Sequence, residues 1–252
     1  MASAESQKLK VLLLRSESSG PDKYVSVLHG NGCDVYTVPT LDFVYQNTDN
    51  LLEQLNAPSS YSGIVFTSPR AVLATSEVMG DHHKVQWMKK MCFVVGERTG
   101  SLVREKFGFN HTGSDSGDAS GLADKIVTMM TGQNLPLLFP CGNMKKETLP
   151  KKLKEAGIQL HSCTVYVTQE HPDLKRKLEE YLALKPDFVV YFSPSGVSFS
   201  HLVLKQSDCF ESIKHVSIGP TTRDALEKSG IQVFASAEKP CPDAVLLAIR
   251  GS

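Results

Sequence analysis

Four short loops combine hydroxyl side chains with glycine or proline in a way that suits anion binding. They are Thr67-Ser68-Pro69, Gly96-Glu97-Arg98-Thr99, Ser193-Pro194-Ser195-Gly196 and Gly219-Pro220-Thr221-Thr222. Each follows a short apolar run and precedes a segment of helical period, so each is expected at a helix start, where unpaired N–H groups and the helix dipole attract anions. The alternative for each loop is structural, because Ser and Thr cap helices and Pro is common in the first helical turn.

Basic residues accompany these loops: Arg15, Arg70, Arg98, Lys145, Lys146 and Arg223. They suit the carboxylates or phosphates of a polyanionic small molecule, or they are solvated charges on helix faces. The whole chain has no basic field, since 27 Lys+Arg balance 27 Asp+Glu among 252 residues. A nucleic-acid partner is therefore not expected.

Tyr166, in the segment Thr164 to Thr168, is the candidate for acid chemistry. A phenol can donate a proton to a leaving oxygen; the alternative is a core tyrosine with a satisfied hydroxyl. Walker A, HExxH, GxSxG and strand-to-helix GxGxxG motifs are absent, which disfavours nucleotide and metal chemistry. Cys141 is expected to be a structural thiol, and the adjacent His82 and His83 are expected in a solvated loop.

The elements that would position these loops alternate between β-prone runs and segments of helical period. This alternation predicts an α/β fold with parallel sheets covered by helices, in which ligands bind outside the carboxyl ends of the strands. The expected strands are 10–15, 33–38, 63–67, 91–95, 110–112, 135–140, 158–167, 187–193, 215–218 and 231–235.

An internal repeat organises these elements into two lobes. The block starting at Phe66 matches the one at Phe192, Gly96 matches Gly219, and Leu12-Leu13 match Leu137-Leu138. The two chain ends therefore complete one lobe. The repeat predicts a discontinuous lobe 1 of residues 1–40 and 169–252 and a continuous lobe 2 of residues 41–168, with five strands each.

The chain must cross between these lobes twice. The crossings fall near Val35 to Thr40 and Thr164 to Thr168, two β-prone segments that are predicted to pair as a two-stranded hinge ladder. The alternative is that both segments simply end ordinary core strands.

Targeting and cysteine signals favour the cytoplasm. The longest apolar run has six residues, Ala244 to Ile249, far short of a membrane span, and MASAESQKLK at the N-terminus lacks a secretory signal. The six cysteines are scattered without a CxxC pair, which suits reduced thiols. A monomer is expected, because nothing resembles a dimerisation heptad.

Taken together and in order, six blocks resemble the uroporphyrinogen-III synthase family: FTSPRAV, VVGERTGSLV, LLFPCGN, GIQLHSCTVYVT, YFSPSGV and SIGPTTRDAL. With VLLLR near the start and the helix after CPDAV, the resemblance covers nearly the whole chain. It implies two flavodoxin-like α/β lobes with five-stranded parallel sheets, a two-stranded β-ladder between them, and an active site in the inter-lobe cleft. One departure is Gly100, where the family often has alanine, which is expected to loosen that helix start.

The resemblance also implies a reaction, in which linear hydroxymethylbilane loses its ring-A hydroxyl and closes with ring D inverted through a spirocyclic pyrrolenine. The products would be uroporphyrinogen III and water, with no cofactor and no metal. Tyr166 carries over as the acid. A transient contact with hydroxymethylbilane synthase is a further expectation. The implied substrate-binding residues are Thr67, Ser68, Thr99, Ser193, Ser195, Gly219, Thr221 and Thr222.

Two other functions stay open from the residues. A non-catalytic two-lobed small-molecule binding module would also use a discontinuous lobe and a central cleft. An enzyme acting on a phosphorylated small molecule would also use helix-start anion cradles, although no phosphate-binding fingerprint is present.

Overall fold

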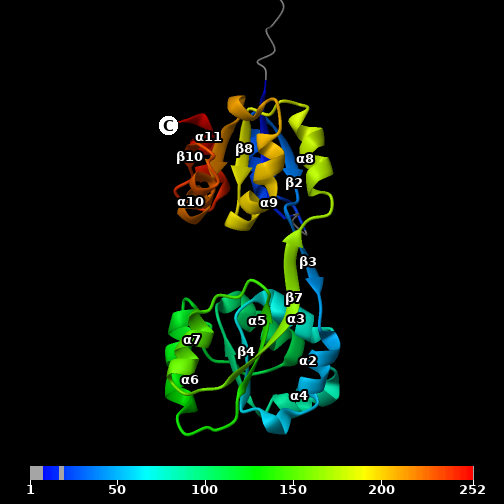
Figure 1. The fold of residues 1–252 in the computed structure, drawn as a ribbon, viewed down its shortest axis with the longest axis vertical. Coiled ribbons are helices and arrows are strands. Elements are labelled where there is room, and N and C mark those ends of the chain that lie inside the picture. The colour runs from blue at the N-terminus through cyan, green and yellow to red at the C-terminus, as the bar shows by residue number, and fades with distance from the viewer. Residues whose placement is uncertain (1–7, 17–19, 252) are drawn as a thin grey trace, which may run out of the picture. The chain divides into compact units, whose positions relative to one another are not determined.

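A computed structural model describes residues 8–16 and 20–251 (Figure 1). Residues 1–7, which belong to the stretch expected to lack a secretory signal, lie outside the described residues. Contacts divide the chain into two compact units. Unit 1 comprises Met1–Asp42 and Gln169–Ser252, and unit 2 comprises Phe43–Thr168.

The described part of unit 1 is built on one five-stranded sheet in which every strand pair is parallel. The sheet order is β10-β9-β8-β1-β2. Counted along the chain of this unit alone, that order is 2-1-3-4-5, the flavodoxin-like arrangement. The strands are β1 (Leu9–Leu14), β2 (Cys33–Val38), β8 (Phe188–Tyr191), β9 (Lys214–Ser217) and β10 (Val233–Ser236).

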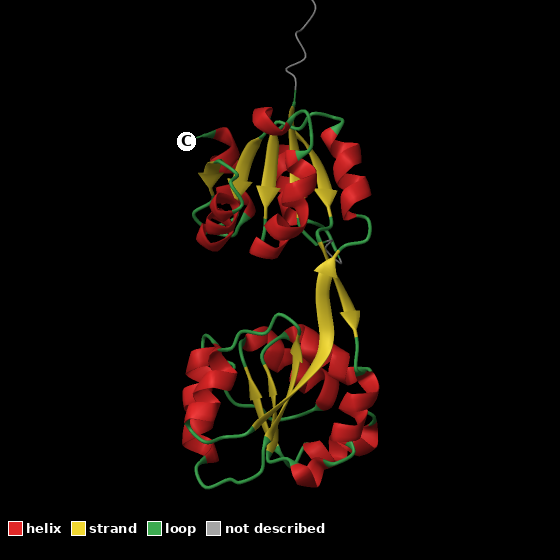
Figure 2. Cartoon of the chain, in the orientation of Figure 1, coloured by secondary structure: helices red, strands yellow, loops and turns green. Residues whose placement is uncertain are grey.

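Helices cover both faces of this sheet (Figure 2). They are α1 (Lys23–Gly30), α8 (Leu174–Leu182), α9 (Pro194–Lys205), α10 (Pro220–Lys228) and α11 (Pro242–Arg250), with the short 3₁₀ helix η2 (Phe210–Ser212). Leu12 and Leu14 of β1 pack with α8, α9 and α10, whereas Val11 and Leu13 pack with α1 and α11. Because both faces of β1 are buried, the strand reads as a continuous apolar run.

Unit 2 has a second sheet of five strands among its described residues, in the order β3-β7-β6-β4-β5. Four of them are parallel. The edge strand β3 runs antiparallel to β7, since the N–H of Gln46 bonds to the carbonyl of Val165 and the N–H of His171 bonds to that of Thr40. The strands are β3 (Leu41–Tyr45), β4 (Gly63–Phe66), β5 (Met91–Val94), β6 (Leu137–Gly142) and β7 (Leu160–Glu170).

The helices of unit 2 repeat the layering of unit 1. They are α2 (Thr48–Leu55), α3 (Pro69–Ser76), α4 (Asp81–Trp87), α5 (Glu97–Phe107), α6 (Ala119–Met130) and α7 (Thr148–Glu155), with the 3₁₀ helix η1 (Pro58–Ser60). Ile64 and Phe66 of β4 pack with α2, α3, α4 and α5, and Val65 packs with α6 and α7. By sheet position, α3 and α5 correspond to α9 and α10. The prediction of two similar flavodoxin-like units is confirmed, except that the sheet of unit 2 has an antiparallel edge strand, β3, where five parallel strands were expected.

Two expectations about individual strands are wrong. The segment 110–112 makes only an isolated bridge, between Phe93 and Thr112, because Gly108 and Gly113 at positive φ confine the extended stretch. The fifth strand of unit 2 is β3 instead. The segment Val35 to Thr40 was expected to pair with Thr164 to Thr168 as the hinge ladder. Val35 to Val38 belong to β2 instead, and Pro39, which has no N–H to donate, separates them from β3, the strand that pairs with β7. The two crossings between units therefore occur in the paired strands β3 and β7.

Among the described residues, none of the helices combines the length and the apolar character that crossing a bilayer requires.

A buried pair in unit 1 predicts acid sensitivity. His215 is 4% exposed, and its Nδ1 lies 2.9 Å from the hydroxyl of the buried Tyr191. Burial lowers the pKa of His215 to about 4, so between its unfolded pKa of about 6.5 and pH 4 the unfolded chain binds a proton that the folded chain does not. We expect the free energy of unfolding to fall by about 3 kcal/mol as the pH drops through this window.

Urea unfolding between pH 4 and pH 7 measures this effect against His215→Gln, which keeps a hydrogen-bonding side chain but does not titrate. The variant should lose less stability on acidification than the parent. Parallel pH profiles for the two proteins would contradict the assignment to His215.

Candidate functional site

The carboxyl ends of the strands in unit 2 bring four of the expected site residues to one edge of the sheet. The N–H of Val95, after β5, bonds to the carbonyl of Phe66 at the end of β4, at 3.0 Å. Thr67 and Ser68 follow β4 directly, and Thr99 lies in the first turn of α5. Tyr166 of β7 stands opposite Gly142 of β6.

Tyr166 owes its direction to an irregularity in the pairing of β6 with β7. The register shifts between Cys141, which faces Thr164, and Gly142, which faces Tyr166. Consecutive residues of a regular strand point to opposite faces, yet Val165 and Tyr166 pack against the same core cluster. The extra residue therefore turns the tyrosine ring to the side of the sheet that carries α3 and α5.

The hydroxyl of Tyr166 lies 3.1 Å from Oγ of Ser68. Oγ of Ser68 also accepts a hydrogen bond from the N–H of Ala71 at 3.2 Å, so the serine is the N-cap of α3. Tyr166 is half-buried, and its ring lies 6.4 Å from that of Phe43 in an edge-to-face arrangement.

A cation stands beside this tyrosine. The guanidinium carbon of Arg70 lies 3.2 Å from the ring centroid of Phe43, in a cation–π stack. Burial lowers the pKa of Arg70; the neighbouring Tyr166 counteracts this effect and the charge of Arg98 adds to it. Arg70 stays charged at neutral pH, as arginines do, and supplies positive charge next to Tyr166.

Unit 1 repeats the arrangement at the carboxyl ends of β8 and β9. The N–H of Ile218 bonds to the carbonyl of Tyr191 at 2.9 Å, as Val95 does to Phe66 in unit 2. Ser193 caps α9 by accepting from the N–H of Gly196 at 3.0 Å. Gly219 begins α10, and Ser195 and Thr221 lie in the first turns of these two helices, half-buried and exposed respectively.

Two of the expected binding residues have buried side chains. Thr99 is 3% exposed and Thr222 is 1% exposed, at equivalent positions in the first turns of α5 and α10. Their hydroxyl groups therefore face the interior of each unit. What these residues can offer a ligand is the backbone N–H of a helix start.

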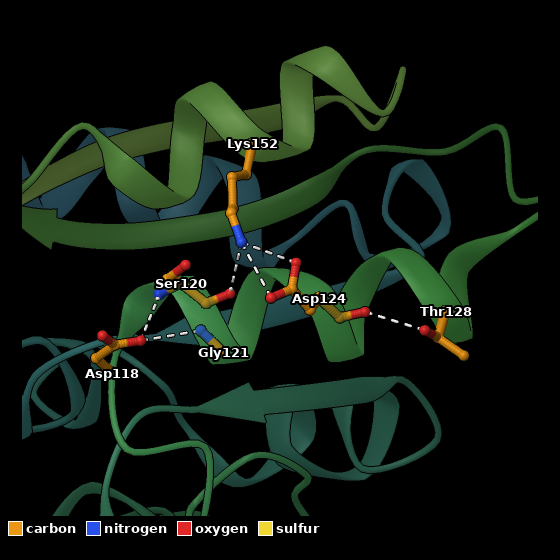
Figure 3. Close-up of polar contacts among 6 residues, drawn as sticks. All are labelled: Asp118, Ser120, Gly121, Asp124, Thr128 and Lys152. Atoms are coloured by element: carbon orange, nitrogen blue, oxygen red, sulfur yellow. Dashed lines mark hydrogen bonds and ion pairs between the residues drawn. The ribbon is translucent and has the colours of Figure 1, made fainter.

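The caps of the site helices differ in charge from those of α1 and α6. α3 and α9 are capped by serine, and α5 and α10 begin at Gly96 and Gly219 without any side-chain cap. In contrast, Asp118 occupies the start of α6 and accepts from the N–H groups of Ser120 and Gly121, both at 2.9 Å (Figure 3). These hydrogen bonds, the Gly121 one first, lower the pKa of Asp118.

Asp22 caps α1 in the same way as Asp118 caps α6. An acidic cap neutralises the positive end of a helix, whereas serine and glycine leave it available to an anion. The starts of α3, α9 and α10, which have no acidic residue in the first turn, therefore attract anions, whereas the start of α5 carries Glu97 beside Arg98.

Cys141, near the end of β6, is a structural thiol. Cys141 is 1% exposed, and burial raises its pKa to about 11, so the thiol is protonated at neutral pH. Within the described residues, no group of three or more His, Cys, Asp or Glu side chains is placed to hold a metal ion.

Sequence reasoning did not single out Gly142, Asn143 and Phe43. A Cβ on Gly142 would lie 2.5 Å from Cζ of Tyr166, so only glycine leaves room for the ring. Asn143 extends the pairing of β6 with β7 through its N–H, bonded to the carbonyl of Tyr166, and its Oδ1, which accepts from the N–H of Thr168. The sequence signal that could have pointed to Gly142 and Asn143 is a Gly-Asn pair at the end of a buried strand.

Gly100 has a packing role. It is buried, and a Cβ at this position would lie 2.6 Å from Cε1 of His111. The glycine makes room for the imidazole ring against the first turns of α5.

Similarity to known proteins extends over nearly the whole chain. The family model for uroporphyrinogen-III synthase HemD matches residues 22–246. The chain is 29% identical over 248 residues to the uroporphyrinogen-III synthase of Schizosaccharomyces pombe, covering 94% of this chain and 95% of that protein. It is also 29% identical to that of Saccharomyces cerevisiae, over 97% of this chain and 96% of the yeast protein. The crystal structure of uroporphyrinogen-III synthetase from Helicobacter pylori shares the fold, with a TM-score of 0.65 at 17% identity, over 96% of this chain and 99% of that one.

Proposed function

Because the chain belongs to the uroporphyrinogen-III synthase family, we propose that it cyclises hydroxymethylbilane, with inversion of ring D, to uroporphyrinogen III and water. The observation that carries the proposal is the family match from residue 22 to residue 246. It favours the synthase over the non-catalytic binding module and over an enzyme for phosphorylated substrates. In reaction class the protein would be a carbon–oxygen lyase.

The charge pattern of the helix starts supports this substrate. Hydroxymethylbilane carries eight carboxylate groups, and such a ligand suits several separate anion-binding helix starts better than one catalytic cluster. The proposed binding residues of unit 2 are Thr67, Ser68 and Thr99, the last through its backbone. Those of unit 1 are Ser193, Ser195, Gly219, Thr221 and Thr222, of which Thr222 would also bind through its backbone.

Tyr166 is the proposed general acid. As the C–O bond to the ring-A hydroxyl breaks, the electron pair leaves with the oxygen, and the phenol proton converts the departing group to water. The substrate is left as an azafulvenium-type cation, and the tyrosinate is stabilised by Ser68 and by the charge of Arg70. The proton released when the last pyrrole regains aromaticity after ring closure restores the phenol.

Selection of the type III product is mainly a matter of geometry. The bilane closes unaided to the uninverted type I isomer, so the enzyme must hold ring D where its substituted carbon attacks first. Binding by many loops at once serves this purpose, because it fixes the conformation of an otherwise flexible chain.

The decisive test supplies freshly generated hydroxymethylbilane and resolves the oxidised products by isomer. We expect type III uroporphyrin in excess over the type I isomer of the enzyme-free control. Type I alone would refute the proposal.

Three further properties belong to the same proposal. We place the protein in the cytosol as a monomer, and its substrate is unstable enough that a transient contact with hydroxymethylbilane synthase would limit spontaneous closure. All six cysteines are free and five of them are buried, as expected in a reducing compartment.

A further inference from the structure

The position of the Tyr166 ring is set by its contact with the backbone of Gly142. A Cβ on Gly142 would lie 2.7 Å from Cε2 and 2.8 Å from the hydroxyl oxygen of Tyr166, so the ring lies flat against this glycine. The register shift at Gly142 and the bond from the N–H of Asn143 to the carbonyl of Tyr166 hold the backbone on both sides of the ring. The hydroxyl is therefore held next to the start of α3.

At that point the hydrogen-bonding capacity of Ser68 is almost fully assigned. A serine hydroxyl has one hydrogen and two lone pairs. One lone pair accepts the N–H of Ala71 at 3.2 Å, and Oγ also lies 3.1 Å from the Tyr166 hydroxyl oxygen. The single hydrogen of Ser68 can therefore be given to the tyrosine oxygen.

The helix start favours this direction of donation. Accepting the N–H of Ala71 at the positive end of α3 polarises the serine oxygen and makes its own hydrogen a better donor. When Ser68 donates, the phenol keeps its proton for another acceptor. In the opposite direction the phenol proton would be occupied by Ser68 before the substrate arrives.

We propose that Ser68 is a positioning residue that links the N-terminus of α3 to Tyr166, donating its hydrogen to the phenol oxygen so that the phenol proton is directed at the departing hydroxyl. The inference rests on the proposed function and refines it, because Ser68 acts through the acid as well as on the substrate. The hydrogen bond from Ser68 strengthens as negative charge develops on the tyrosine oxygen during proton transfer.

A double-mutant cycle tests this link. Ser68→Ala should lower kcat about tenfold in the parent protein, because it removes a hydrogen bond to a group that becomes charged. In the Tyr166→Phe background the same substitution should change kcat by less than about twofold, since the group through which it acts is gone. Equal losses of kcat in both backgrounds would overturn the proposal and leave the acid role of Tyr166 standing. Parental turnover in Tyr166→Phe would overturn both.

Two more variants separate helix capping from donation. Ser68→Asp accepts the N–H of Ala71 but has no hydrogen to give at neutral pH, whereas Ser68→Thr keeps both capacities. We expect the threonine variant to retain most of the parental kcat and the aspartate variant to be at least as slow as Ser68→Ala, although it keeps its unfolding midpoint. Equal turnover of the threonine and aspartate variants would overturn the proposal. When the turnover of Tyr166→Phe is too low to measure, this comparison takes the place of the double-mutant cycle.

Ser193→Ala is the matched control for the loss of a cap. Ser193 caps α9 as Ser68 caps α3, but among the described residues its hydroxyl has no tyrosine partner. Its effect on kcat should be the same with and without Tyr166→Phe. A dependence on Tyr166 as strong as that of Ser68→Ala would show that the coupling is not specific to Ser68 and would overturn the proposal.

Discussion

Tyr166→Phe is expected to lower turnover roughly ten- to a thousandfold while the fold persists. The substitution removes the acid but leaves the ring, which lies on Gly142 and packs against the core cluster of unit 2. Ser68 keeps its bond to Ala71, so the cap of α3 survives. The measurement is the rate of type III formation at saturating hydroxymethylbilane, with urea unfolding of the same preparations.

Tyr181→Phe provides the control for this substitution. Tyr181 is half-buried in α8 of unit 1 and packs on Tyr36, with ring centroids 5.1 Å apart. Removing its hydroxyl should leave turnover at the parental value. Near-parental rates in Tyr166→Phe would remove Tyr166 from the acid role, and the departing hydroxyl would then need another proton donor.

The two-lobed organisation could be predicted because the matching sequence blocks include strands that are buried on both faces. Leu12-Leu13 and Leu137-Leu138 lie in β1 and β6, the equivalent strands of the two sheets. Such strands must be continuously apolar, so the duplication survives as a visible match at constant spacing. The glycine and serine starts of the site helices are visible for a similar reason, since backbone geometry and capping restrict those positions to few residue types.

Features that depend on tertiary contacts were not visible. The edge strand β3 has a half-exposed pattern with an apolar run of only three residues, Phe43 to Tyr45, and its pairing with β7 depends on residues more than a hundred positions away. His83 was expected in a solvated loop and instead lies in α4, 2% exposed. Its Nδ1 accepts from the N–H of Gly80, and Nε2 contacts Oδ1 of Asn56 at 2.8 Å. Whether a polar side chain of this kind is buried depends on the hydrogen-bond partners available to it and not on its own polarity.

For the site, the sequence predicted which loops take part but not the geometry around Tyr166. The positions after β4, β5, β8 and β9 follow from strand ends, and Tyr166 follows from its place in a predicted crossing segment and from the family resemblance. The register shift that aims Tyr166, the close approach of Gly142 and the stacking of Arg70 on Phe43 depend on pairing between strands. A sequence shows a glycine at position 142, but it does not show which ring lies against it.

The second large effect is expected from Gly219→Asp, which should stabilise the fold and impair binding at the same time. Gly219 has an extended backbone with φ of 169°, and no atom lies within 4 Å of the place its Cβ would take, so an aspartate fits without strain. Its carboxylate would cap α10, as Asp118 caps α6, and raise the free energy of unfolding by about 0.5–1 kcal/mol. The same carboxylate would occupy and neutralise the helix start proposed to receive a substrate carboxylate.

The expected result for Gly219→Asp is a KM for hydroxymethylbilane raised about 10- to 100-fold, because one charge-assisted contact is replaced by repulsion. Gly219→Asn has the same size and caps the helix without charge, so it isolates the electrostatic effect; we expect its KM to rise only a few-fold. The difference in KM between the aspartate and asparagine variants should shrink at high salt, because salt screens interactions between partly exposed charges. If the aspartate variant kept the KM of the asparagine variant at low salt, no substrate carboxylate would meet the start of α10, and the anion-binding role of this helix would have to be abandoned.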